Sequence, residues 1–156
     1  PIAGVNGEET TKEIITVLEK YGVKKLKTEN LIHKTFIEIW GSGKPQREFL
    51  WSEDMADASV FIMENIDFKD CITNKKEVRN THINIGTGED ISIKELAFLI
   101  KNIVGYKGGF VFDTSKPDGT PRKLTEVSKL SALGWRHSIK IEEGVQKMYS
   151  WYNSLY

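Results

Sequence analysis

Glycine and proline residues divide this chain into short apolar segments, and the spacing of the apolar residues changes from one segment to the next. Phe36–Trp40 alternates β-branched and aromatic residues, a pattern typical of a strand, and two glycines follow it closely. Ser92 and Glu95 form a capping-box pattern, and the apolar residues after them recur at helical spacing as far as Gly105. Strands that alternate with helices in this way predict a layered α/β fold.

The same patterns predict the remaining elements and a division of the chain. We expect helices over residues 10–21, 54–64, 127–133 and 141–152, with Ser52 as the N-cap of the second, and strands over 83–85 and 110–112. Residues 1–34 are interpreted as an insertion-like helix (10–21) and connector (23–34), and residues 35–156 as one domain.

Composition limits the kinds of partner and location. With 22 basic and 22 acidic residues among 156, the net charge is zero, which argues against DNA or an anionic membrane as a partner of the whole surface. No apolar run approaches the roughly 20 residues that span a bilayer, and no signal peptide is visible. The single cysteine, Cys71, suits a reducing compartment. We therefore expect a cytoplasmic protein with no nucleic-acid or membrane partner.

The first of two basic loops runs from Trp40 to Leu50 and contains two glycines and a proline. A guanidinium such as that of Arg47 can bind a phosphate or a ribose edge through paired hydrogen bonds. The alternative for Arg47 is a surface ion pair with Glu48 or Glu53. Trp40 is either a core residue or a platform on which a ligand ring stacks.

The second basic loop covers residues 116–123 and contains two prolines and one glycine. Such a loop is stiff, so it can hold Asp118, Arg122 and Lys123 for a ligand at little ordering cost. The alternative is a plain charged turn at the surface.

Several other patterns resemble catalytic motifs without satisfying them. Pro45 follows Gly43-Lys44, where a Walker phosphate loop needs Ser or Thr, and the third glycine of a dinucleotide fingerprint beginning at Gly86 would fall at Ile91. Gly22 interrupts the helix that a catalytic Tyr-x-x-x-Lys pair would need. Cys71 and the three histidines share no ligand-like spacing, so we expect neither a nucleophilic cysteine nor a metal site.

Both loops, in this order, resemble the C-terminal part of the GDP-L-fucose synthase family of extended short-chain dehydrogenases/reductases. The resemblance covers roughly residues 36–151. The stretch Arg47-Glu48-Phe49-Leu50 is shared widely among extended short-chain dehydrogenases, whereas residues 116–123 match this family more specifically. The resemblance implies that the residues contacting a GDP-sugar substrate are Trp40, Arg47, Asp118 and Lys123.

The resemblance also implies an enzyme that converts GDP-4-keto-6-deoxy-D-mannose to GDP-L-fucose by 3,5-epimerisation and NADPH-dependent reduction. We expect an α/β substrate-binding C-terminal portion of short strands and packed helices, with the N-terminal Rossmann cofactor domain absent. On this interpretation NADP(H) binds mainly to that missing domain, no cofactor is expected on the fragment, and the fragment alone is inactive because it holds no catalytic residues. The family implies a homodimer.

Two alternatives stay open at this point. One is a non-catalytic nucleotide-sugar-binding or interaction module. The other is a part of a different NDP-sugar epimerase or dehydratase.

Overall fold

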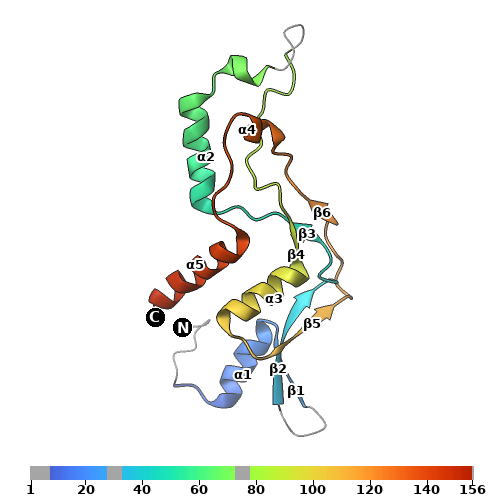
Figure 1. The fold of residues 1–156 in the computed structure, drawn as a ribbon. Coiled ribbons are helices and arrows are strands. Elements are labelled where there is room, and N and C mark those ends of the chain that lie inside the picture. The colour runs from blue at the N-terminus through green and yellow to red at the C-terminus, as the bar shows by residue number, and fades with distance from the viewer. Residues whose placement is uncertain (1–7, 28–32, 73–77, 156) are drawn as a thin grey trace. The chain divides into compact units, whose positions relative to one another are not determined.

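The structure, a computed structural model, describes residues 8–27, 33–72 and 78–155 (Figure 1). The chain divides into two compact units. Unit 1 consists of residues 1–44 and 105–119, and unit 2 of residues 45–104 and 120–156. Each unit is built from two separate stretches of the chain.

Unit 1 is a three-stranded mixed sheet with one helix. Its elements are α1 (Thr11–Lys20), β1 (Val23–Lys27), β2 (His33–Trp40) and β5 (Gly109–Asp113). The strand order is β1-β2-β5, with β1 antiparallel and β5 parallel to β2. Helix α1 begins with a capping box in which Thr10 and Glu13 satisfy each other's backbone N–H groups. The parallel pair places the carboxyl ends of β2 and β5 side by side, at Trp40 and Asp113.

Unit 2 has a sheet of very short strands and most of the helices. Its elements are β3 (Gln46–Arg47), α2 (Ser52–Asn65), the 3₁₀ helix η1 (Phe68–Cys71), β4 (Ile91–Ser92), α3 (Ile93–Val104), β6 (Arg122–Lys123), α4 (Ser128–Ala132) and α5 (Ile141–Ser154). The strand order is β4-β3-β6, with β4 antiparallel and β6 parallel to β3. Because each strand contributes only two residues, packing and side-chain hydrogen bonds must supply much of the cohesion.

The core of unit 2 forms around three buried side chains. Ala58 of α2, Leu130 of α4 and Trp135 are 0%, 1% and 6% exposed, and partly buried apolar residues surround them: Leu50, Phe61, Ile62, Ile83 and Ile85. The indole N–H of Trp135 donates to Asp57 at 2.8 Å, so this large ring is buried without leaving its polar group unsatisfied.

Asp54, in the first turn of α2, is a buried carboxylate at 5% exposure. Its Oδ1 accepts hydrogen bonds from the amide and hydroxyl of Ser138 at 3.1 and 2.7 Å, and its Oδ2 accepts from the amide of Ile139 at 3.0 Å. Burial alone raises the pKa of Asp54, but these hydrogen bonds outweigh it and the pKa is lowered. The charged carboxylate therefore ties α2 to the segment that leads into α5.

The main helices predicted from the sequence are confirmed as α1, α2, α3, α4 and α5, and the predicted strands at 36–40 and 110–112 are confirmed within β2 and β5. The capping box that opens α3 is confirmed too. Glu95 accepts from the amide and hydroxyl of Ser92, and Ser92 accepts from the amide of Glu95.

Three local predictions are wrong. Residues 83–85 form no strand, because Ile83 and Ile85 reach the core from an irregular segment. Ser52 is the first residue of α2, and the N-cap position belongs to Trp51. Part of the expected connector over 23–34 is instead β1, which pairs with β2. The proposed boundary between residues 34 and 35 stays a prediction.

The expected fold class also needs correction. The prediction was a substrate-binding portion with the Rossmann part absent, but the opening residues contribute β1 and part of β2 to a mixed sheet that includes a parallel pair. The physical reason is that β2 and β5 pair across a connection of nearly 70 residues, which local periodicity does not reveal.

No described helix is both long and apolar enough to cross a membrane.

We predict that Asp54→Asn lowers the free energy of unfolding by about 2 kcal/mol, because an amide nitrogen would face a backbone donor where an oxygen now accepts. Urea denaturation at pH 7 measures the change, with Glu64→Gln on the same helix as the exposed control. Since the folded pKa lies below the ordinary value of 3.8, the stabilisation is present above that value and is lost as the pH falls through the folded pKa. The difference between wild type and variant should therefore shrink below about pH 4, and a constant difference would contradict this account.

Candidate functional site

The carboxyl end of β2 carries an exposed aromatic ring in unit 1. Trp40 is the last residue of β2 and is 72% exposed. It is therefore not a core residue, which was one of the two alternatives from the sequence. Gly41 and Gly43 follow it with φ values of 82° and 73°, which side chains other than glycine rarely adopt. The amide of Gly41 donates to the carbonyl of Asp113 at 2.9 Å, so the loop starts from the edge of the sheet.

Asp118 fastens this loop through two hydrogen bonds. Its Oδ1 accepts from the amide of Ser42 at 2.7 Å, and its Oδ2 accepts from the Ser42 hydroxyl at 2.6 Å. A Cβ at Gly41 would collide with Oδ1, so the glycine makes room for the carboxylate. The hydroxyl of Ser42, followed by its amide, lowers the pKa of Asp118, which is therefore ionised at neutral pH.

A cation lies over the exposed ring. Nζ of Lys116 is 5.5 Å from the centroid of the Trp40 ring, within cation–π range. The sequence interpretation did not single out Lys116 for this contact. Its position in the second basic loop was the available signal, but the distance to Trp40 is set by the fold.

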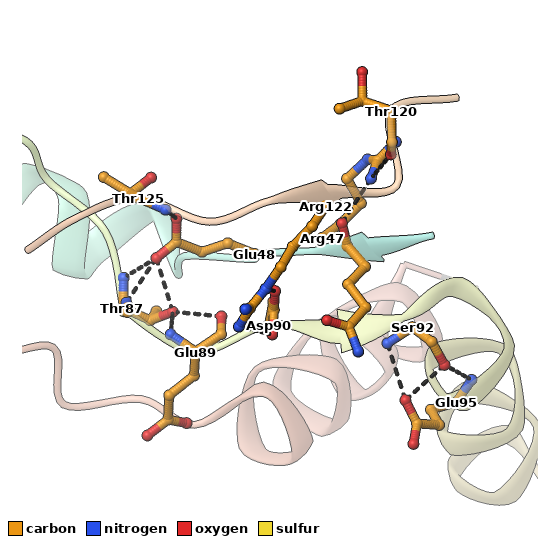
Figure 2. Close-up of polar contacts among 12 residues, drawn as sticks. Arg47, Glu48, Thr87, Glu89, Asp90, Ser92, Glu95, Thr120, Arg122 and Thr125 are labelled. Atoms are coloured by element: carbon orange, nitrogen blue, oxygen red, sulfur yellow. Dashed lines mark hydrogen bonds and ion pairs between the residues drawn. The ribbon is translucent and has the colours of Figure 1, made fainter. Parts of the chain in front are cut away.

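Arg47 of β3 belongs to unit 2, where its side chain is bound to backbone oxygens. Its Nη1 donates to the carbonyl of Gln46 at 2.6 Å and to that of Thr120 at 2.7 Å (Figure 2 shows the Thr120 contact). These bonds are therefore not the surface ion pair with Glu48 or Glu53 that was the alternative. A guanidinium has five N–H donors in a planar fork, so a side chain oriented in this way keeps donors for an anion.

Lys123 lies beside Arg47 on the neighbouring strand. In the parallel pairing of β3 with β6, Arg47 is the register partner of Lys123 and Gln46 that of Arg122. Arg122 is engaged by Asp90, with Nε and Nη2 donating to the two carboxylate oxygens. Of the three residues expected from the second loop, the side chain of Arg122 is thus committed to an ion pair within unit 2.

A cavity of about 610 Å³ opens beside Arg47 within unit 2. Arg47 and Phe49 line it together with Thr87, Glu95, His137 and Ile141, among others. Its walls combine apolar surface with groups of both charges, as small-molecule sites do.

The four expected substrate residues are divided equally between the two units. Trp40 and Asp118 belong to unit 1, and Arg47 and Lys123 to unit 2. Sequence reasoning missed Glu48 as a bonded partner of the Gly86-Thr87-Gly88 turn, and the Arg122–Asp90 ion pair. The signal for Glu48 was its place in the widely shared stretch after Arg47, but nothing in the sequence names its partners.

The chain belongs to the NAD dependent epimerase/dehydratase family, whose model matches residues 4–86. GDP-L-fucose synthase of Escherichia coli (strain K12) is 50% identical over 121 residues, which cover 74% of this chain and 36% of that protein. The chain spans about a third of the length of the curated relatives that it matches.

Two solved structures from Campylobacter jejuni are also similar. A GDP-6-OMe-4-keto-L-xylo-heptose reductase has a TM-score of 0.80 and 45% identity, covering 95% of this chain and 40% of its own. A GDP-mannoheptose C4 reductase with NADP bound has a TM-score of 0.66 and 52% identity, covering 76% of this chain and 35% of its own.

These findings correct two predictions. We expected a chain from which the Rossmann cofactor region is absent and on which no cofactor is to be expected. The family match begins at residue 4 and includes β1 and β2, and a relative of 52% identity carries NADP. Both predictions are wrong. They relied on the resemblance to the C-terminal part of the family, in which the glycine fingerprint of the cofactor region precedes the matched residues.

The Gly86-Thr87-Gly88 turn is a candidate seat for the cofactor's pyrophosphate. Such a seat offers free backbone N–H groups ahead of a helix. Here the amides of Thr87 and Gly88 donate to Oε1 of Glu48 at 2.6 and 2.7 Å. An anionic side chain already occupies the position that a phosphate would take, so this turn does not fit the group.

We predict that Asp118→Ala accelerates amide hydrogen exchange at Ser42 at least tenfold, because that amide loses its acceptor. Exchange followed by NMR measures the effect residue by residue. The neighbouring amide of Gly41, which donates to Asp113, is the internal control and should change less than threefold. Unchanged exchange at Ser42 would show that Asp118 does not hold the loop.

Proposed function

We propose that this chain is part of an NADPH-dependent epimerase/reductase acting on a GDP-4-keto sugar, and that its first candidate activity is GDP-L-fucose synthesis. In that reaction GDP-4-keto-6-deoxy-D-mannose undergoes 3,5-epimerisation and 4-reduction. The 50% identity to the E. coli synthase supports the proposal, as do the two basic loops. A homodimer is part of the proposal.

The observation that carries the proposal is the register pairing of Arg47 with Lys123. Neighbouring strands lie roughly 5 Å apart, so two cations at the same register position can face the two phosphates of one diphosphate. Arg47 supplies a planar donor fork and Lys123 a point charge, both suited to phosphate oxygens. In our proposal these two residues hold the diphosphate of the GDP-sugar.

In unit 1, the side chains of Trp40 and Asp118 are suited to contacts with the base or the sugar of the ligand. The exposed face of Trp40 offers stacking to a base or a sugar, and Lys116 adds a positive charge next to it. Asp118 uses one lone pair on each carboxylate oxygen for Ser42, and an ionised carboxylate has about four acceptor positions. In our proposal Trp40 stacks on the ligand and Asp118 accepts a hydroxyl hydrogen bond while it holds the loop.

A second candidate is reduction of a GDP-4-keto-heptose. The heptose reductase with a TM-score of 0.80 is 45% identical and aligns over 95% of this chain. The two candidates share the nucleotide and the keto group and differ in the sugar. Assays with both GDP-sugars separate them.

We predict that Arg47→Ala in the full-length enzyme raises the KM for the GDP-sugar at least tenfold, because a charged hydrogen-bond partner of the phosphates is lost. Steady-state kinetics measure the change, and Arg136→Ala, an exposed arginine of the same unit, is the matched control. An unchanged KM would remove Arg47 from the site. Equal use of UDP- and GDP-sugars would favour a general nucleotide-sugar epimerase or dehydratase.

A further inference from the structure

Glu48 follows Arg47 directly and is bonded to two distant segments of unit 2 (Figure 2). Its Oε1 accepts from the amides of Thr87 and Gly88 at 2.6 and 2.7 Å and from the hydroxyl of Thr87 at 3.1 Å. Its Oε2 accepts from the amide of Thr125 at 3.0 Å. Both carboxylate oxygens are therefore bound, and three of the four donors are backbone groups.

The surroundings are shaped to receive this carboxylate. A Cβ on the buried Gly86 would lie 2.6 Å from Oε1 of Glu48 and 2.9 Å from Cβ of Thr125, so only glycine leaves enough room. Burial raises the pKa of Glu48, but the hydrogen bonds from Thr125, Gly88 and Thr87 outweigh it and the pKa is lowered. The side chain is thus ionised at neutral pH.

Glu48 acts where the backbone ladder between β3 and β6 ends. Both strands stop at the register pair Arg47–Lys123, and the amide of Gln46 donates to the carbonyl of Pro121 on the side before the pair. On the side after the pair, the contact between Glu48 and Thr125 takes over. The two cations are therefore bracketed by a backbone hydrogen bond on one side and by a carboxylate on the other.

Glu48 also connects to the cavity beside Arg47. Arg47, Phe49 and Thr87 line that cavity, whereas Glu48 reaches the backbone of the turn that carries Thr87. Successive residues of an extended segment point to opposite faces, which explains how one short stretch serves both purposes. Glu48 thus holds one wall of the cavity without lining it.

We propose that Glu48 is a positioning residue that fixes Arg47 and Lys123 relative to each other for the diphosphate of the substrate. It does not touch the substrate. This inference rests on the function proposed above. Glu48 thereby affects substrate affinity although it is not one of the four residues expected to bind the substrate.

Asp54 supplies the matched control. It too is a carboxylate of unit 2 that accepts from backbone amides and one hydroxyl, with two amides where Glu48 has three, but its partners are Ser138 and Ile139. A merely structural role for Glu48 predicts that both carboxylates behave alike when neutralised. A positioning role predicts that only Glu48 affects the binding of the GDP-sugar.

The experiment compares four variants of the full-length enzyme: Glu48→Gln, Asp54→Asn, Arg47→Ala and the Glu48→Gln/Arg47→Ala double variant. In Glu48→Gln, the amide nitrogen would face backbone N–H donors where a carboxylate oxygen now accepts. The hydrogen bonds that hold Glu48 to Thr87 and Gly88, or to Thr125, are then lost. We expect the KM for the GDP-sugar to rise at least fivefold, with kcat and the KM for NADPH within twofold of wild type. Asp54→Asn should leave both KM values unchanged, and the double variant should raise KM no further than Arg47→Ala alone.

Each contrary result has a distinct meaning. If Arg47→Ala raises KM but Glu48→Gln leaves it unchanged, the positioning role is overturned and the proposed function stands. Multiplied effects in the double variant would also overturn it, since Glu48 would then act independently of Arg47. If Arg47→Ala has no effect, Arg47 does not bind the diphosphate and the positioning role fails with it, whereas no turnover of either GDP-sugar by the wild-type enzyme would overturn the proposed function. Should Glu48→Gln not fold, Glu48→Asp decides: a threefold rise in KM for the GDP-sugar alone supports the role, and no rise overturns it.

Discussion

Backbone amides in irregular segments need acceptors, and in unit 2 two carboxylates provide them over long distances along the chain. Glu48 accepts from residues 39, 40 and 77 positions away, and Asp54 from residues 84 and 85 positions away. Because the three strands of this unit are two residues long, ladder hydrogen bonds alone connect few segments. The carboxylates join the loops to β3 and α2, and the small apolar core of Ala58, Leu130 and Trp135 completes the unit.

Unit 1 uses the same arrangement on a smaller scale. Asp118 holds Ser42 across 76 positions of the chain, and a glycine stands against the carboxylate, as Gly86 stands against Glu48. In both places the absent side chain lets an anion approach backbone N–H groups closely. Residues proposed to bind the ligand lie next to these contacts, Trp40 two residues before Ser42 and Arg47 directly before Glu48. Because these hydrogen bonds hold the backbone next to the proposed ligand-binding residues, less conformational entropy is lost when a ligand binds.

The local features of the chain were predictable because their determinants lie within a few residues. The Ser92–Glu95 capping box and the helical periodicity after it correctly predicted α3, and α5 was found by periodicity alone. The strand expected at residues 83–85 was wrong, because an apolar alternation indicates two buried side chains and not a pairing partner. Strands β3, β4 and β6 were missed for the complementary reason: two residues form a strand only when another segment lies beside them. The cofactor region was wrongly placed outside the chain, since its usual signature is a glycine pattern that the strands in residues 4–86 do not carry.

The sequence by itself determined the main helices, the Ser92–Glu95 capping box of α3, and the two basic loops that carry Trp40, Arg47, Asp118 and Lys123. Only the tertiary structure decided that β2 pairs in parallel with β5, and that Arg47 and Lys123 share a register while Arg122 is bound by Asp90. It also decided which amides Glu48 binds. The difference has one physical reason. Helical hydrogen bonds and caps join residues three or four positions apart, whereas parallel pairing and carboxylate–amide bonds join residues many tens of positions apart, whose proximity no local pattern encodes.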